Sequence, residues 1–118
     1  MSLEELKALL DWINETPTEC DGATRFVSKE LHDRGITHTI KAGFCQHIKT
    51  VVEPHFWVEV EGFIVDYRLK MWVTQSDKLA PLPNGVFRPE EFPQTVYDGE
   101  EIHLEILPDG LYELMKRG

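Results

Sequence analysis

The sequence predicts an α+β fold in which an antiparallel sheet packs against an N-terminal helix. Apolar residues recur at helical spacing as far as Gly35 and then alternate from Ile36 onward, which is the period of a half-buried strand. Glu61 and Gly62 separate two alternating segments, a spacing typical of a tight hairpin. At 118 residues the chain has room for one hydrophobic core, so we expect a single domain over residues 1–118.

The first helix is expected over residues 2–14. Ser2 and Glu5 have the spacing of a capping box, in which each side chain accepts a hydrogen bond from the other residue's backbone. The apolar residues of this segment recur on one side, so the helix should place that side on the core.

A second helix carries the first of two cysteines. It starts with either Thr16 or Thr18 as its N-cap residue, and in both cases Cys20 lies near its first turn. Gly35 is a natural left-handed stop at its end. The residues expected to face inward are Ala23, Phe26, Val27 and Leu31.

The remaining elements follow from alternation and from turn residues. The run PHFWVEVEGFIVDYRL is the clearest hairpin of the chain, with apolar residues on one side of both strands. Before it we expect a strand over Thr37–Phe44 and a loop over Gln46–Glu53. After it we expect a long proline-containing ordered loop over Thr74–Pro93, a strand over Glu101–Leu107 and a closing helix over Gly110–Lys116. The acidic residues expected in a solvated loop are Asp98, Glu100 and Glu101.

The net charge of −9 makes nucleic acid and anionic membrane surfaces poor partners. No apolar run approaches the roughly 20 residues that span a bilayer, and the acidic N-terminal segment has no basic region followed by an apolar one. We therefore expect a cytoplasmic location. Cys20 and Cys45 should then remain reduced, so each thiol serves either chemistry or packing.

The hairpin brings a histidine and a carboxylate together. With a two-residue turn, Val60 pairs with Phe63 and Trp57 pairs with Asp66. His55 then lies two residues along from Trp57 on the same face, as the diagonal neighbour of Asp66. Such neighbours are about 7–8 Å apart, which side chains bridge. We expect the N-terminus of the cysteine helix to dock on this face.

These residues have the types and order of a thiol nucleophile with its base. The positive end of a helix dipole favours a thiolate at Cys20. His55 would accept the proton and later deliver it to a leaving group, while Asp66 holds the imidazole in place. Trp57 would wall the thiol site as the substrate-binding residue. No metal and no organic cofactor is needed for this chemistry.

Each of these residues also has an ordinary alternative. Cys20 could be a buried structural thiol, and Asp66 could pair with Arg68 or face water. Cys45 is a rival reactive thiol, although a strand end gives it no helix dipole. A metal site is disfavoured because the spacings lack close ligand pairs such as C-x-x-C. Its candidate ligands would be Cys20, Cys45, His47 and His55.

The chain resembles the core of the transglutaminase-like superfamily, which is related to papain-like cysteine enzymes. The resemblance is carried by CDGATRFVSKELHDRGI, by a strand ending in AGF and by HFWVEVEGFIVD, within residues 16–70. It implies a transglutaminase-like/papain-like core with Cys20, His55 and Asp66 as the triad. It also implies a cysteine-dependent acyl-transfer enzyme of peptidase or amidase type, acting on a peptide or protein substrate that carries an amide. The superfamily includes inactive relatives, so the alternative is a catalytically silent module that binds a peptide or protein partner.

Overall fold

The computed structural model describes residues 1–117, which form an α+β fold with a five-stranded antiparallel sheet in the order β4-β3-β2-β1-β5. The predicted domain runs one residue further, to Gly118, which lies outside the described residues. No helix within residues 1–117 is long and apolar enough to cross a membrane. The α-helices are α1 (Leu3–Leu10), α2 (Cys20–Asp33) and α3 (Asp109–Lys116). The strands are β1 (Thr39–His47), β2 (Thr50–Val60), β3 (Phe63–Asp66), β4 (Gly85–Phe87) and β5 (Thr95–Ile102).

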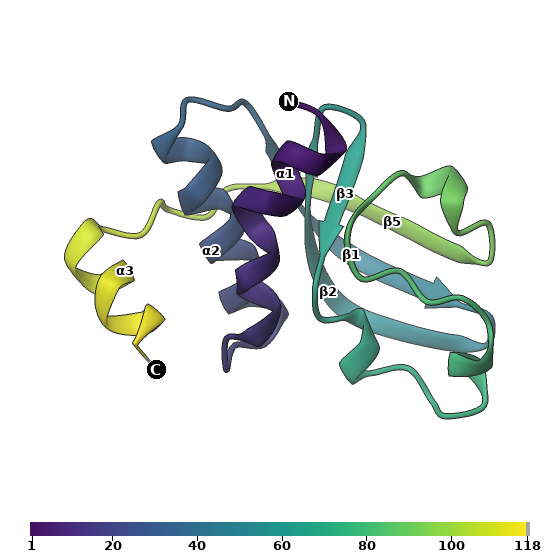
Figure 1. Ribbon diagram of the computed structural model, residues 1–118. Coiled ribbons are helices and arrows are strands. Elements are labelled where there is room, and N and C mark those ends of the chain that lie inside the picture. Colours follow the sequence, from purple (N-terminus) through teal and green to yellow (C-terminus); the bar gives the residue numbers. More distant parts are fainter. Residues whose placement is uncertain (118) are drawn as a thin grey trace.

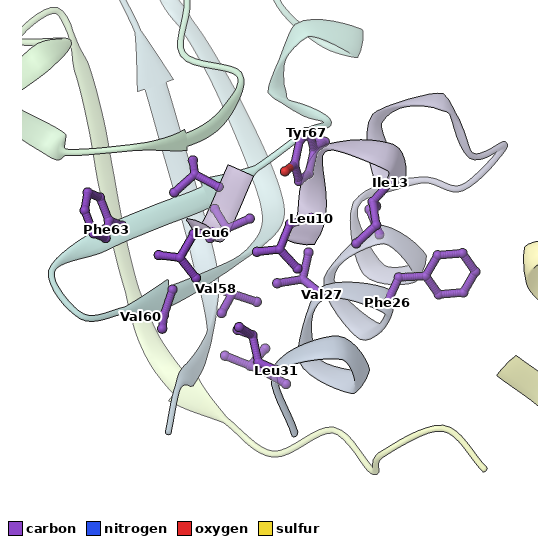
Figure 2. Packing of buried hydrophobic residues seen from close by; sticks show 14 of the residues in the cluster. Leu6, Leu10, Ile13, Phe26, Val27, Leu31, Val58, Val60, Phe63 and Tyr67 are labelled. Carbon is purple, nitrogen blue, oxygen red and sulfur yellow. The ribbon is translucent and has the colours of Figure 1, made fainter. Parts of the chain in front are cut away.

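Both faces of the sheet are covered. The helices gather on one side, and much of the long segment between β3 and β5 lies on the other (Figure 1). Figure 2 shows the helix side, where Leu6 and Leu10 of α1 and Val27 of α2 meet the strand residues Val58 and Val60. On the opposite side two smaller clusters are buried. Their buried members are Cys45, Val52, Leu69 and Val73 in one, and Trp57, Ile64 and Phe87 in the other.

The predicted start of the first helix and the predicted stop of the second helix are confirmed. Ser2 Oγ accepts from the backbone N–H of Glu5 at 3.2 Å, and Glu5 Oε1 accepts from the backbone N–H of Ser2 at 3.1 Å. The α-helix ends at Leu10 and continues as a 3-10 helix over Asp11–Glu15. At the end of α2, Gly35 has a φ of +67°, and Ile36 N–H donates to the Leu31 carbonyl at 2.9 Å. This bond is the long closing contact of a Schellman motif.

The predicted start of α2 is wrong. The N-cap residue is Glu19, and neither Thr16 nor Thr18 caps the helix. Both threonines are instead bound by the guanidinium group of Arg68, which donates to the Thr16 carbonyl at 2.8 Å and to the Thr18 hydroxyl at 3.3 Å. Because the threonines have these partners, the helix begins later and Cys20 becomes its first residue.

The predicted loop over Gln46–Glu53 is also wrong, because this segment forms a hairpin. The strand β1 starts two residues later than expected and runs on to His47, which pairs with Thr50 of β2. The turn has no glycine to announce it: Ile48 adopts the left-handed conformation, with a φ of +57°. The β-branched residues that follow favour an extended strand.

The hairpin between β2 and β3 forms as predicted. Val60 pairs with Phe63, and both turn residues, Glu61 and Gly62, have positive φ, at +51° and +84°. These angles define the primed turn whose twist matches that of paired strands. The strand β3 ends at Asp66, three residues earlier than expected.

The C-terminal half differs most from the predictions. The expected loop over residues 74–93 contains β4, which pairs with β3, and two 3-10 helices at Asp77–Leu79 and Pro89–Glu91. The last strand lies at Thr95–Ile102 rather than at residues 101–107, and it pairs with β1. The acidic residues expected in a loop are exposed on this edge strand instead. The closing helix is confirmed as α3.

Candidate active site

His55 and Asp66 form a buried hydrogen-bonded pair. His55 Nε2 and Asp66 Oδ2 are 2.6 Å apart, and both side chains are almost completely buried. The other carboxylate oxygen accepts from the backbone N–H groups of Arg68 at 2.9 Å and Leu69 at 3.2 Å. The Tyr97 hydroxyl donates to Oδ2 at 2.8 Å. A buried carboxylate needs several such donors, because burial without partners is costly.

Asp66 does not pair with the guanidinium group of Arg68, the ordinary alternative that the sequence leaves open. That group lies instead against the chain that precedes α2. It donates to the carbonyls of Ile13 at 2.9 Å and Thr16 at 2.8 Å, and also to the carbonyl of Thr18. Arg68 therefore positions the segment that leads into Cys20.

The helix that carries Cys20 packs on the face opposite to the one expected. Its buried residues meet Val58 and Val65, whereas His55 and Trp57 lie on the other face. The two faces of the sheet are connected beyond the end of β3, where β2 has no neighbouring strand on that side. Because β3 ends at Asp66, residues 52–56 of β2 have no strand beside them on this side, and Cys20 lies next to them.

The second ring nitrogen of His55 is available to the thiol. Nδ1 is buried and has no hydrogen-bond partner within residues 1–117. Burial alone would lower the pKa of this imidazole, but the hydrogen bond to Asp66, its negative charge and the nearby Cys20 outweigh burial and raise the pKa to about 9. The ring is therefore protonated at neutral pH, which is the state that stabilises a neighbouring thiolate.

Trp57, predicted to bind substrate, is only 1% exposed. Its ring stacks on His55 with centroids 6.1 Å apart, and its Nε1–H donates to Glu59 Oε2 at 3.2 Å. Trp57 therefore packs against the imidazole and has almost no exposed surface for a ligand to contact.

The second cysteine lies in an unreactive environment. Cys45 is completely buried on β1, and burial together with the negative charge of Asp66 raises its pKa to about 12. Its neighbour His47 is also buried, and bonds to Thr95 Oγ1 at 2.7 Å and to the Asp77 carbonyl at 2.9 Å. Within residues 1–117 no group of three or more His, Cys, Asp or Glu side chains is placed to hold a metal ion.

A cleft of about 340 Å³ opens in front of Cys20. Its lining combines three carboxylates with apolar side chains, and Trp72 is 47% exposed. The lining residues are Glu19, Cys20, Asp21, Val52, Glu53, Pro54, Phe56 and Trp72. Cys20 also lines a smaller cavity, which Asp66 lines as well.

Sequence reasoning missed Tyr97, the cleft residue Trp72 and the part that Arg68 plays in holding the segment before α2. The β-branched and aromatic residues Thr95, Val96 and Tyr97 favour a strand there. The contact from Tyr97 to Asp66 has no local signal, because β5 reaches the site only through its pairing with β1.

Comparison with family models, with curated proteins and with solved structures finds no match to this chain. The structure itself shows the class of fold. It is an α+β fold in which the helix that begins with Cys20 packs on a five-stranded antiparallel sheet.

Proposed function

We propose that this protein is a cysteine-dependent acyl-transfer enzyme that hydrolyses an amide bond in a peptide or protein. The observation that carries the proposal is the short bond from His55 Nε2 to Asp66, which leaves the buried Nδ1 for the thiol of Cys20. A base oriented by a carboxylate and placed beside a nucleophile is the common arrangement of such enzymes.

The proposed reaction has two stages. The Cys20 thiolate attacks the amide carbonyl carbon, and the imidazolium of His55 gives its Nδ1 proton to the departing amine as the C–N bond breaks. Water then attacks the resulting thioester, with Nδ1 accepting its proton. The C–S bond breaks, and the products are a carboxylic acid and the free thiol. Asp66 keeps the imidazole oriented through both stages.

The start of α2 supports the same reaction. Cys20 is the first residue of the helix, so its backbone N–H has no partner within the helix and lies at the positive end of the dipole. This N–H would stabilise the oxyanion that forms on the carbonyl oxygen. Removal of one such donor typically slows an enzyme by about 10²–10³.

The resemblance to the transglutaminase-like superfamily agrees with this proposal in order and in context. In this chain the nucleophile opens a helix, the histidine lies on a strand and the carboxylate ends the next strand. We place the protein in that superfamily as part of the proposal.

A catalytically silent module that binds a peptide is the second candidate. The observation that favours it is the presence of three carboxylates in the lining of the cleft, because carboxylates close to Cys20 oppose the formation of a thiolate. Such a module would use the same cleft without needing a reactive cysteine.

Thiol reactivity separates the two candidates. We expect iodoacetamide at pH 7 to alkylate Cys20 at least about tenfold faster than Cys45, which serves as the internal control because it is buried. In His55→Gln the rate at Cys20 should fall while Cys45 stays inert. A Cys20 as slow as Cys45, or one that does not respond to the loss of His55, contradicts the enzyme.

Turnover is then measured on a peptide library by mass spectrometry. The active protein should cleave amides and accumulate an acyl adduct on Cys20, and Cys20→Ala should do neither. If Cys20 is reactive but forms no acyl adduct with any amide, the binding module is the better description.

A further inference from the structure

Three carboxylates line the cleft beside the thiol. Glu19 and Asp21 flank Cys20 in sequence, and Glu53 belongs to β2. All three are exposed, and none takes part in a hydrogen bond between side chains or in an ion pair within the described 117 residues. Their charges are therefore free to act on whatever enters the cleft.

Helix stability explains two of these residues but not the third. Carboxylates at the N-terminus of a helix are stabilised by its dipole, which accounts for Glu19 and Asp21. Glu53 is on a strand, immediately before Pro54, and has no helix to cap. It adds negative charge to a site whose nucleophile is itself an anion, and this opposes the proposed chemistry unless a cation is also present.

The rest of the cleft fits the stem of a long side chain. Val52, Pro54 and Phe56 provide apolar surface, and Trp72 is 47% exposed although it is a large aromatic residue. An exposed indole attracts cations to its face and packs against the aliphatic part of lysine and arginine. Cys20 is one of the residues that line the cleft, and the pKa of the buried His55 is raised in part by this cysteine.

We infer that the cleft binds a lysine or arginine side chain of the substrate, next to the amide that Cys20 would attack. The cation lies between Glu53 and the carboxylates at the start of α2, and its aliphatic stem packs on Trp72. The reaction part of this inference rests on the proposed function, whereas the binding of a cationic side chain does not. A bound cation also offsets the carboxylates, so that the correct substrate favours the thiolate that attacks it.

Charged methanethiosulfonate reagents test the electrostatic potential that the cleft produces at Cys20. The thiolate of Cys20 attacks the sulfenyl sulfur, a mixed disulfide forms and methanesulfinate leaves. We would measure the rate at which Cys20 reacts with the cationic trimethylammonium-ethyl reagent and with the anionic sulfonato-ethyl reagent. Each rate is divided by the rate of the same reagent with 2-mercaptoethanol, and the cationic value is then divided by the anionic value to give a ratio. We expect the cationic reagent to be favoured on the order of tenfold in 10 mM salt. The ratio should approach one in 1 M salt, where screening acts within about 3 Å.

Matched variants show which charge is responsible. Glu53→Gln should lower the ratio by about threefold, the effect in water of one unit charge about 12 Å away on two reagents that differ by two charges. Glu90→Gln makes the same change in net charge on an exposed 3-10 helix outside the cleft, and should leave the ratio unchanged. A ratio near one in the wild type, or an equal change in both variants, overturns the inference.

A binding measurement keeps the inference testable even if the thiol proves inert. We expect acetyl-arginine N-methylamide to shift the indole NMR signal of Trp72 in Cys20→Ala, and the neutral citrulline analogue to bind severalfold more weakly. Equal binding of the two compounds, or no binding of either, overturns the inference. Preference for arginine without any dependence of Cys20 reactivity on His55 would instead retain the cationic site and overturn the proposed enzyme.

Discussion

The hydroxyl of Tyr97 donates to the same oxygen of Asp66 that contacts His55, at 2.8 Å, although two strands separate β5 from β3 in the sheet. Burial and the charge of Asp66 raise the pKa of Tyr97 well above its ordinary value. The hydroxyl therefore keeps its proton and remains a donor. The Tyr97 ring also packs on Trp57, with centroids 5.0 Å apart.

Tyr97→Phe should weaken both the fold and the site. Hydrogen bonds to charged groups contribute about 1.5–3 kcal/mol, so we expect the free energy of unfolding to fall by about 2 kcal/mol in urea denaturation. Alkylation of Cys20 at pH 7 should slow severalfold, because Asp66 is then held less firmly. Tyr112→Phe is the control: Tyr112 donates to Glu30 at 2.6 Å on the helix side and should lose similar stability with no change at Cys20. Equal effects of both variants on Cys20 would contradict a positioning role for Tyr97.

The raised pKa of His55 predicts a pH-dependent stability. A histidine whose pKa is 6.5 when unfolded and about 9 when folded binds a proton more tightly in the native state. Its contribution to the free energy of unfolding is complete below about pH 6.5 and is lost as the pH rises through about 9. We therefore expect the free energy of unfolding to fall over this window, measured by urea denaturation, while NMR titration follows the ring. In Asp66→Asn the pKa of His55 should drop, and a slope that persists there would assign the effect to other groups.

Arg68→Lys should be far from conservative. The guanidinium group of Arg68 donates to several carbonyls of the segment before α2, and an ammonium group cannot reproduce this planar fan of donors. We expect the free energy of unfolding to fall by about 3 kcal/mol, because buried carbonyls lose their partners. Arg88→Lys is the control, since Arg88 is exposed and packs over the ring of Phe63, at 4.3 Å. Similar losses in the two variants would rule out a special role for Arg68.

The close approach of β5 to β1 depends on Gly43 of β1 and Gly99 of β5, which pair with each other. A Cβ atom added to Gly99 would overlap the Ala42 carbonyl oxygen and lie 2.8 Å from the ring of Trp57. Gly99→Ala should therefore cost about 3 kcal/mol, as overpacking does, and lower the melting temperature. Gly110→Ala, at a position with no atom within 4 Å, should be neutral or stabilise α3 by up to about 1 kcal/mol. A Gly99→Ala protein as stable as the wild type would show that the strands can separate without loss.

The parts of the fold that the sequence predicts correctly are local. The capping box of Ser2 and the left-handed stop at Gly35 each depend on residues within one or two turns. The two-residue turn at Glu61 sets the register that brings His55 and Asp66 together, so this half of the site was predictable. The contacts that were missed join distant segments and leave no periodic signal.

The docking face of α2 illustrates the difference. Alternation identified the apolar face of β2 and β3 correctly, and hydrophobic burial draws the helix there. The sequence-based prediction placed the helix on the other face in order to bring Cys20 to His55. It did not foresee that β3 ends at Asp66 and leaves an edge of β2 open to the thiol. Nor did it foresee that the segment after β3 would bury the second face, because its strand and short helices lack a clear period.

The position of β5 has a consequence for the newly synthesised chain. The three residues of the proposed triad lie within the first 66, but β5 lies beside β1 and comes last among the strands. Residues 95–102 must leave the ribosome before Tyr97 can cover Trp57 and reach Asp66. A nascent chain that stops short of β5 thus holds Cys20, His55 and Asp66 without the Tyr97 hydroxyl that donates to Asp66 and without the ring that packs on Trp57. In the proposed enzyme, the surroundings of His55 and Asp66 are therefore complete only after β5 has paired with β1.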